Sequence, residues 1–207
     1  KLRDQLNLNC RVLEKGSGIG GTWYWNRYPG ARCDSPSHSY SYYFSEDLIK
    51  KWTWTERYPG QPEIESYLNF VADELGLRPN ICFGQTVNKC EYKQDQNYWH
   101  ITTADGIEFQ TKYLIAAVGC LSMSNKPVIK GIETFTGSIF HTGNWPKEKI
   151  NFFGKSVAVI GTGASAIQAI PLIAEQAEKL TVFQRTPNYS VPACNHKLSA
   201  ETSKKYK

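Results

Sequence analysis

A glycine-rich segment that follows an apolar run carries the clearest chemistry in this sequence. Residues 157–160 are Val-Ala-Val-Ile, and Gly161, Gly163 and Ala166 follow them in a G-x-G-x-x-A pattern. The first glycine permits a tight turn, the second lets the backbone approach a phosphate, and the small third residue permits close helix–strand packing. The amides at the start of the following helix then face the anion. The pattern predicts a site for the pyrophosphate of a dinucleotide.

The residue that distinguishes two dinucleotides is expected where the next strand ends. An NAD site usually carries an acid there, because a carboxylate accepts hydrogen bonds from the ribose hydroxyls. Arg185 occupies this position here. A guanidinium suits the 2′-phosphate of NADP, so the sequence predicts NADP(H).

A second glycine cluster lies near the start of the chain. The glycines at 16–21 also satisfy G-x-G-x-x-G, but the Trp- and Tyr-rich residues 22–29 that follow are not expected to open a helix. We therefore interpret residues 10–14 as the second strand of a Rossmann unit and Glu14 as its ribose-binding acid. The phosphate loop of that unit is then expected before Lys1, and the glycines would let this loop pass close to a ligand.

The segment before the second glycine turn combines two aromatic anchors with one imidazole. Phe135, Gly137, His141, Trp145 and Pro146 fit the pattern F-x-G-x-x-x-H-x-x-x-W-P. On residue types alone, a structural histidine is favoured over an acid–base role for His141. We expect His141 and Trp145 to couple the two nucleotide-binding units rather than to transfer protons.

Two α/β units are needed to hold these residues. In the first unit a helix is predicted over residues 62–76, because Pro62 stands at its start and Gly76 past its end. Residues 1–9 are interpreted as the last turns of a helix that leads into strand 10–14. Further strands, forming a β-meander, are predicted at residues 85–92, 98–103, 107–110 and 113–118.

In the second unit the pattern predicts strand 157–160, helix 164–180 with a kink at Pro171, and strand 181–185. The predicted fold class is therefore α/β, with two Rossmann-like dinucleotide-binding units, both truncated.

Length, charge and cysteine content exclude several classes of protein. The 207 residues, 41% hydrophobic and 21% charged, are typical of a globular chain. The longest apolar stretch, residues 113–123, is too short for a membrane span. The net charge of +5 is scattered, which argues against a nucleic-acid site, and the basic residues at 204–207 are interpreted as a solvated tail. Cys10, Cys82 and Cys120 lie in apolar runs, which indicates buried thiols in a reducing, cytoplasmic compartment and no metal site.

Three segments together resemble the Baeyer–Villiger monooxygenases, above all the phenylacetone and cyclohexanone monooxygenases. They are the Trp-rich loop 20–34, the linker 135–146, and the glycine turn 161–168 with residues 183–186. The resemblance implies an oxidoreductase that binds FAD and uses NADPH and O2. Such a flavoprotein inserts one oxygen atom next to a ketone carbonyl and gives an ester or lactone.

The resemblance also divides the chain. Residues 1–130 would form an FAD-binding domain without its first strand and phosphate loop. Residues 131–155 would form the linker, and residues 156–207 the first part of an NADP-binding domain. We expect these 207 residues alone to be inactive.

The resemblance implies roles for individual residues. The FAD contacts would be Glu14, Thr22, Trp23, Tyr24, Trp25, Asp34, Tyr40 and Val87. The NADP contacts would be Arg32, Cys33 and Asp34 on the nicotinamide side, Gly161, Thr162, Gly163, Ala164, Ser165, Ala166, Ile167 and Gln168 at the pyrophosphate, and Arg185 and Thr186 at the 2′-phosphate. Asp34 and His141 are the candidate catalytic residues, and an arginine that pairs with Asp34 is expected beyond Lys207.

Two other functions remain open from the sequence. A related flavin monooxygenase could oxidise nitrogen or sulfur instead of a ketone, and oxidation of amines or sulfides without any ketone turnover would distinguish it. The chain could also be a non-catalytic NADP-binding module, which would bind NADP without oxidising it.

Overall fold

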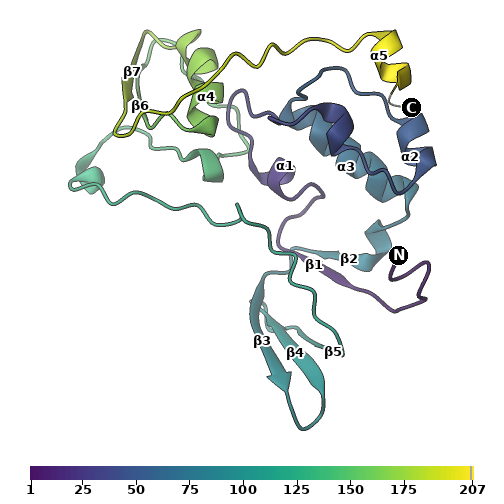
Figure 1. Cartoon of the computed structure of the whole chain (residues 1–207). Coiled ribbons are helices and arrows are strands. Elements are labelled where there is room, and N and C mark those ends of the chain that lie inside the picture. The colour runs from purple at the N-terminus through teal and green to yellow at the C-terminus, as the bar shows by residue number, and fades with distance from the viewer. Residues whose placement is uncertain (206) are drawn as a thin grey trace.

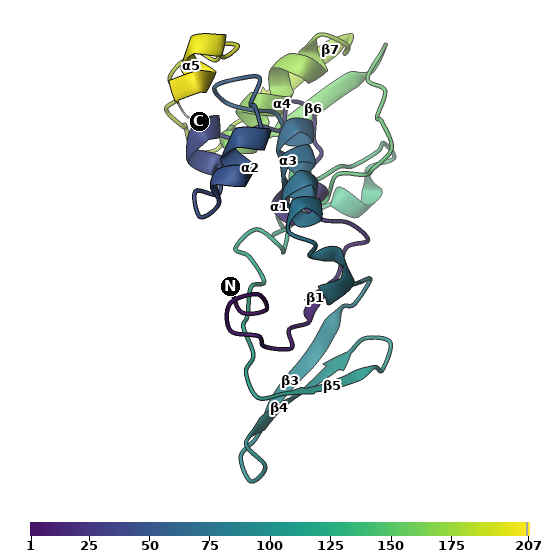
Figure 2. The same cartoon turned by 90° about the vertical axis from the view of Figure 1, so that its right-hand side faces the viewer.

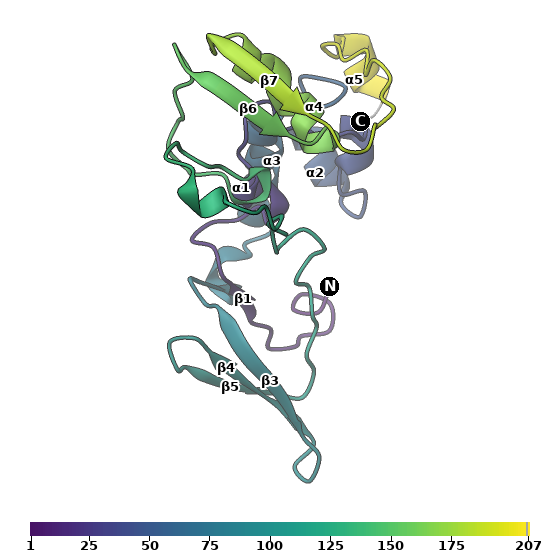
Figure 3. The ribbon, with the colours of Figure 1, turned by 90° about the vertical axis from the view of Figure 1, so that its left-hand side faces the viewer.

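The computed structural model describes residues 1–205 and residue 207. Helices α2 (Glu46–Lys51), α3 (Gln61–Glu74) and α5 (Ala200–Lys205) lie on one side of the molecule (Figure 1). The unit formed by β6 (Ser156–Ile160), α4 (Ala164–Ala174) and β7 (Lys179–Phe183) lies on the other. Strands β3 (Val87–Lys93), β4 (Tyr98–Thr103) and β5 (Glu108–Thr111) extend away from both groups, as the two side views show (Figures 2 and 3). The predicted α/β class is confirmed.

The first unit contains two short parallel strands. β1 (Val12–Glu14) pairs with β2 (Ile81–Phe83), and α3 lies between them in the chain, which is a β–α–β connection. The sequence did not reveal β2, because three residues are too few for a periodic pattern. The helix expected over residues 1–9 is wrong. These residues form turns, and Leu2 and Leu6 stay exposed, so no buried face stabilises a helix there.

Helix α3 is the centre of the larger hydrophobic core and confirms the helix predicted at residues 62–76. It begins with a proline in its first turn, and Gly76 follows its end with a left-handed φ of 54°. Its buried face packs against the loop and the helix α2 around it. The residues of this core are Cys33, Leu48, Trp54, Ile64, Tyr67 and Val71.

The predicted β-meander is present in three of its four strands. β3 (Val87–Lys93), β4 (Tyr98–Thr103) and β5 (Glu108–Thr111) form an antiparallel sheet in the order β3-β4-β5. The turn between β4 and β5 uses Gly106 at a φ of 84°, and its N–H donates to the Thr103 carbonyl at 3.0 Å.

The fourth predicted strand, residues 113–118, is wrong. It pairs with no strand in the part of the chain that the structure describes. The apolar pattern was read correctly, but a strand also needs a partner. Without one, the side chains of Tyr113 and Val118 are 70% and 75% exposed.

The second unit is the parallel pair β6 (Ser156–Ile160) and β7 (Lys179–Phe183), joined through helix α4 (Ala164–Ala174). The predicted helix 164–180 is too long, because residues 175–178 form a turn in which Ala177 pairs with Phe153. The strand predicted at 181–185 therefore starts and ends two residues earlier. A second small core forms under α4 from Phe152, Ala169 and Ile173.

The remaining elements are short. They are helix α1 (Thr22–Trp25) and the 3₁₀ turns Ser37–Tyr40, Arg78–Asn80, Ile132–Thr134 and Thr142–Asn144. The expectation that residues 22–29 would open no helix is corrected by the single turn of α1. Lys204, Lys205 and Lys207 are exposed, as expected of a solvated tail, although α5 extends to Lys205 and the Lys207 Nζ donates to the Lys50 carbonyl at 3.1 Å.

The cysteine interpretation is largely wrong. Cys10 and Cys82 are half-buried and Cys120 is exposed, whereas the buried thiol is Cys33. An apolar sequence neighbourhood did not predict burial, because residue 120 lies in the same unpaired segment as residues 113–118. Among the described residues, no helix is long and apolar enough to cross a membrane.

Candidate functional site

The glycine turn between β6 and α4 opens to its surroundings. Gly161 has a φ of 104°, which favours glycine, and its N–H donates to the Phe183 carbonyl at 2.8 Å. Gly163 is the N-cap of α4 and provides no side-chain cap. A Cβ added at either glycine would meet no atom within 4 Å. The space beside both glycines is therefore open, which leaves room for an anion at the start of α4.

The segment after β7 lies against this turn. Gln184 Nε2 and Asn188 Nδ2 donate to the Thr162 hydroxyl at 2.7 and 3.3 Å. Arg185 and Thr186 lie between these two donors, past the end of β7, and both are exposed. The structure thus brings the predicted 2′-phosphate residues beside the predicted pyrophosphate turn. Gln184 and Asn188 were missed, because no sequence motif marks them.

The other predicted residues of α4 divide between its two ends. Ala164, Ser165 and Ala166 form its first turn, and the N–H of Ile167 donates to the Gly163 carbonyl at 3.0 Å. These residues lie where the fingerprint predicted.

Gln168 points instead toward the Trp-rich loop of the first unit. Its Oε1 accepts from the Tyr28 hydroxyl at 2.8 Å and from the Arg32 N–H at 3.3 Å, and its Nε2 donates to the Arg32 carbonyl at 3.1 Å. Both ends of the side-chain amide are thus engaged by the loop. Gly30 lies equally close to α4, since a Cβ there would be 2.4 Å from the Gln168 carbonyl oxygen.

Tyr24 is the buried residue of α1 and a centre of polar contacts. Its hydroxyl is 2.6 Å from the Ser17 hydroxyl and accepts from Lys147 Nζ at 2.6 Å. These two hydrogen bonds, with Lys147 the larger cause, lower the pKa of the Tyr24 phenol. Added Cβ atoms at Gly16 and Gly18 would lie 2.9 and 2.6 Å from its ring. Those glycines therefore make room for Tyr24, and the close approach of this loop to a ligand stays a prediction.

The neighbours of Tyr24 differ in exposure. Trp23 donates its ring N–H to the Tyr40 hydroxyl, and burial raises the pKa of Tyr40. Trp25 is partly exposed, with Lys15 Nζ 5.9 Å from its ring centroid. The aromatic side chains of this loop thus serve both as internal packing and as an outer surface.

Arg32, Cys33 and Asp34 lie beside the start of α3, where Arg32 pairs with Gly60. The Cys33 N–H donates to the Pro59 carbonyl at 3.0 Å, and burial raises the pKa of the Cys33 thiol. Asp34 is exposed, and its carboxylate makes no hydrogen bond or ion pair among the described residues. This carboxylate is therefore exposed directly after a residue whose backbone is hydrogen-bonded to Pro59.

The two remaining FAD candidates lie in the first unit. Glu14 ends β1, and its Oε1 accepts from the Gly16 N–H at 2.6 Å. Val87 begins β3 and is exposed. No contact joins these two side chains, so the structure does not by itself assemble them into one site.

The linker histidine has a structural contact. His141 Nδ1 accepts from the Gly143 N–H at 3.1 Å and caps the short turn Thr142–Asn144. Trp145 packs against the core under α4, with its ring centroid 6.3 Å from that of Phe152. These contacts agree with a linker that is attached to the second unit.

Comparisons with known proteins identify the family. The family model of pyridine nucleotide-disulphide oxidoreductases matches residues 3–206. The chain is 49% identical over 194 residues to an acetone monooxygenase (methyl acetate-forming) of Gordonia sp. (strain TY-5), which covers 94% of this chain and 36% of that protein. It is 42% identical over 207 residues to a phenazine N-monooxygenase of Lysobacter antibioticus, and the match covers 100% of this chain and 38% of that protein.

A solved structure gives the same result. The NADP+-bound cyclohexanone monooxygenase from Rhodococcus sp. Phi1 superposes with a TM-score of 0.94 at 44% identity, over 99% of this chain and 38% of that one. The chain thus spans well under half the length of the relatives it matches. The resemblance to Baeyer–Villiger monooxygenases is confirmed, since forming methyl acetate from acetone inserts oxygen next to a carbonyl. This chain belongs to the pyridine nucleotide-disulphide oxidoreductase family and is similar, over nearly its whole length, to the Baeyer–Villiger monooxygenases.

Proposed function

We propose that the full-length protein is an FAD-containing, NADPH-dependent Baeyer–Villiger monooxygenase. It would insert one atom of O2 next to a ketone carbonyl and give an ester or lactone. One observation supports this most strongly: helix α4 joins both parts of the expected site. Its first turn is open to a pyrophosphate, and its Gln168 holds the backbone of Arg32, two residues before Asp34.

The glycine turn fits an NADP pyrophosphate. The chain's own packing does not require glycine at position 163, where φ is −73° and a Cβ would meet nothing within 4 Å. A closely bound phosphate does require it. Residues 161–167 would bind the pyrophosphate, with Thr162 oriented by its two amide donors. Arg185 and Thr186 would bind the 2′-phosphate. We do not include Gln168 among these residues, because its side-chain amide binds Tyr28 and Arg32 of the Trp-rich loop.

The first unit offers a set of residues that fits FAD. Glu14 lies at the carboxyl end of β1, where α/β sheets bind their ligands. Residues 22–25, Asp34, Tyr40 and Val87 would complete the contacts. When bound, FAD supplies the redox chemistry that activates oxygen, with NADPH as the source of electrons.

The chain's own residues bind and orient. Arg32, held by Gln168, would lie on the nicotinamide side of NADP together with Cys33. Asp34, which is exposed, would hold an arginine of the full-length protein beside the reacting oxygen. His141, which caps a turn, would couple the linker to the second unit without transferring a proton.

The substitution Gly163→Ala tests the NADP part of this proposal in the full-length protein. The free chain has room for the new methyl group, so folding and FAD content should match wild type. The dissociation constant for NADP+ should rise roughly 5- to 150-fold, because overlap with a bound phosphate costs about 1–3 kcal/mol. Unchanged NADP+ affinity would remove this turn from the site.

Substrate classes separate the proposed reaction from its alternatives. The N-monooxygenase relative makes nitrogen oxidation the second candidate function. NADPH oxidation should be stimulated by small and cyclic ketones with formation of esters or lactones. Turnover of aromatic amines or sulfides alone would favour the second candidate. NADPH binding without oxidation would favour a non-catalytic module.

The domain boundaries, partners and location are part of the same proposal. Residues 1–130 would belong to the FAD domain, 131–155 to the linker and 156–207 to the NADP domain. The partners would be a ketone and O2, without nucleic acid or membrane. The free cysteines of the described residues agree with a cytoplasmic location, which fractionation of the native cells would test.

A further inference from the structure

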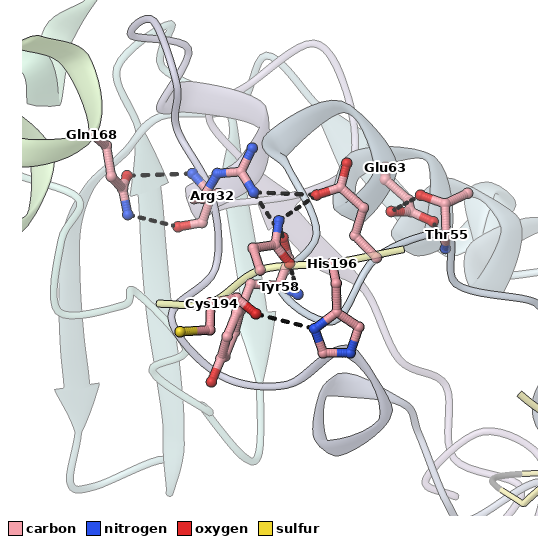
Figure 4. Close-up of polar contacts among 9 residues, drawn as sticks. Arg32, Thr55, Tyr58, Glu63, Gln168, Cys194 and His196 are labelled. Atoms are coloured by element: carbon pink, nitrogen blue, oxygen red, sulfur yellow. Dashed lines mark hydrogen bonds and ion pairs between the residues drawn. The ribbon is translucent and has the colours of Figure 1, made fainter. Parts of the chain in front are cut away.

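A segment that follows the second unit returns to the first one. We define residues 194–198 as the strap. The Arg57 N–H donates to the His196 carbonyl at 3.0 Å, and the Leu198 N–H donates to the Thr55 carbonyl at 2.9 Å. The strap thereby runs antiparallel beside residues 55–58, as Figure 4 shows around Thr55, Tyr58 and His196. The strap is not a strand, but a single antiparallel bridge, between Glu56 and Lys197, and these hydrogen bonds attach it to residues 55–58.

Asn195 fixes the strap through its side chain. Its Oδ1 accepts from the Tyr58 N–H at 2.9 Å. Its Nδ2 donates to the Tyr58 carbonyl at 3.3 Å and to Glu56 Oε2 at 2.5 Å. The amide thus uses both of its ends, and one bond goes to a carboxylate.

The same Glu56 oxygen also binds Arg32. Arg32 Nη1 donates to Glu56 Oε2 at 3.2 Å and to the Tyr58 carbonyl at 3.1 Å. The Arg32 backbone is held from the opposite direction by Gln168 of α4, and Figure 4 shows both sets of bonds. Arg32 is therefore held on two sides. Gln168 of α4 binds its backbone, while its guanidinium binds Glu56 and Tyr58, the two residues that Asn195 of the strap also contacts.

We propose that Glu56 is a positioning residue that connects the docked strap, through Asn195, to the guanidinium of Arg32. Docking of the strap would then set the orientation of Arg32 relative to Asp34 and to the nicotinamide side of NADP. The role of Arg32 at NADP rests on the proposed function. The connection from strap to Arg32 rests on the contacts alone.

Three variants of the full-length protein test the connection by hydrogen exchange. Asn195→Ala removes the strap's side-chain bonds, and Glu56→Gln removes the charge that faces Arg32 but keeps an oxygen for Asn195. Glu46→Gln is the matched control, because Glu46 is an exposed residue of α2 whose ion pair is with Lys50, far from the strap in the chain. Exchange is measured without NADP in the peptides that cover residues 30–34, 55–58 and 194–198.

The expected pattern separates positioning from simple attachment. Asn195→Ala should accelerate exchange in all three peptides. Glu56→Gln should accelerate hydrogen exchange in residues 30–34 and leave exchange in the strap as slow as in wild type. Glu46→Gln should change none of them. Faster strap exchange in Asn195→Ala with residues 30–34 unchanged would overturn the proposal.

Kinetics give a second readout. The Arg32 and Glu56 side chains are 37% and 35% exposed, so their ion pair is partly screened. The KM for NADPH should rise about two- to fivefold in Glu56→Gln and in Asn195→Ala, with kcat little changed. In the double variant the KM for NADPH should rise no further than in either single variant, since both substitutions act through one contact. Additive effects on KM would contradict the connection.

A wild-type protein that does not oxidise NADPH would refute the proposed function. Hydrogen exchange would still decide the positioning role of Glu56.

Discussion

Gly30→Ala is expected to damage the contact between the Trp-rich loop and α4. Gly30 has a φ of 77°, and a Cβ there would lie 2.4 Å from the backbone oxygen of Gln168 and 3.1 Å from Leu172 Cδ1. A left-handed conformation costs an alanine about 1–2 kcal/mol. The backbone cannot yield as a flexible side chain would, so displacing the loop from α4 should cost about 1–3 kcal/mol more.

Gly76→Ala is the matched control for this prediction. Gly76 has a φ of 54°, and a Cβ there would meet nothing within 4 Å. Gly76→Ala should therefore lower the free energy of unfolding by the conformational cost alone, about 1–2 kcal/mol, because no overlap is added. Gly30→Ala should lose about 2–5 kcal/mol in all.

The assay is denaturant unfolding of the full-length variants, with hydrogen exchange to locate the change. Gly30→Ala should accelerate exchange in residues 28–34 and 168–172, and Gly76→Ala should leave both segments protected. Equal losses of stability in the two variants, with α4 and the loop still protected, would refute the close packing inferred here.

Three further predictions concern the full-length protein. Arg185→Ala should lower the preference for NADPH over NADH by roughly 10- to 150-fold in kcat/KM, because a charge-assisted bond contributes about 1.5–3 kcal/mol; an unchanged ratio would remove Arg185 from the 2′-phosphate site. His141→Gln should retain most activity, because the glutamine oxygen can still accept from Gly143; near-complete loss with normal folding and FAD content would indicate acid–base work. Lys147→Met should raise the pKa of Tyr24, measured by ultraviolet titration against Tyr24→Phe. Because that pKa is lowered in the folded protein, its stabilising effect is present at alkaline pH and is lost as the pH falls through it. Lys147→Met should therefore weaken the fold mainly at alkaline pH, and an equal loss at neutral pH would contradict this.

The nucleotide-binding unit was predictable because its determinants are local. The glycines at 161 and 163, the apolar run before them and Arg185 lie within one β–α–β unit, where spacing alone fixes their relations. Helix α3 was predictable for the same reason, since its proline, its apolar face and its terminal glycine are contiguous.

The contacts between the units were not predictable. Gln168 was assigned to the pyrophosphate, yet it binds residues near position 30, and nothing in its own neighbourhood indicates that distant partner. Asn195 and Glu56 are equally far apart in the chain. Residues 113–118 failed for the opposite reason: their local pattern favours a strand, but pairing depends on residues elsewhere.

The central claim is tested most directly by isotope transfer. The purified full-length protein, with its flavin, is incubated with NADPH, a small ketone and ¹⁸O-labelled O2. We predict an ester or lactone that carries one labelled oxygen atom, formed in step with NADPH consumption. Consumption of NADPH with release of hydrogen peroxide and no labelled ester, for any ketone supplied, would contradict the account.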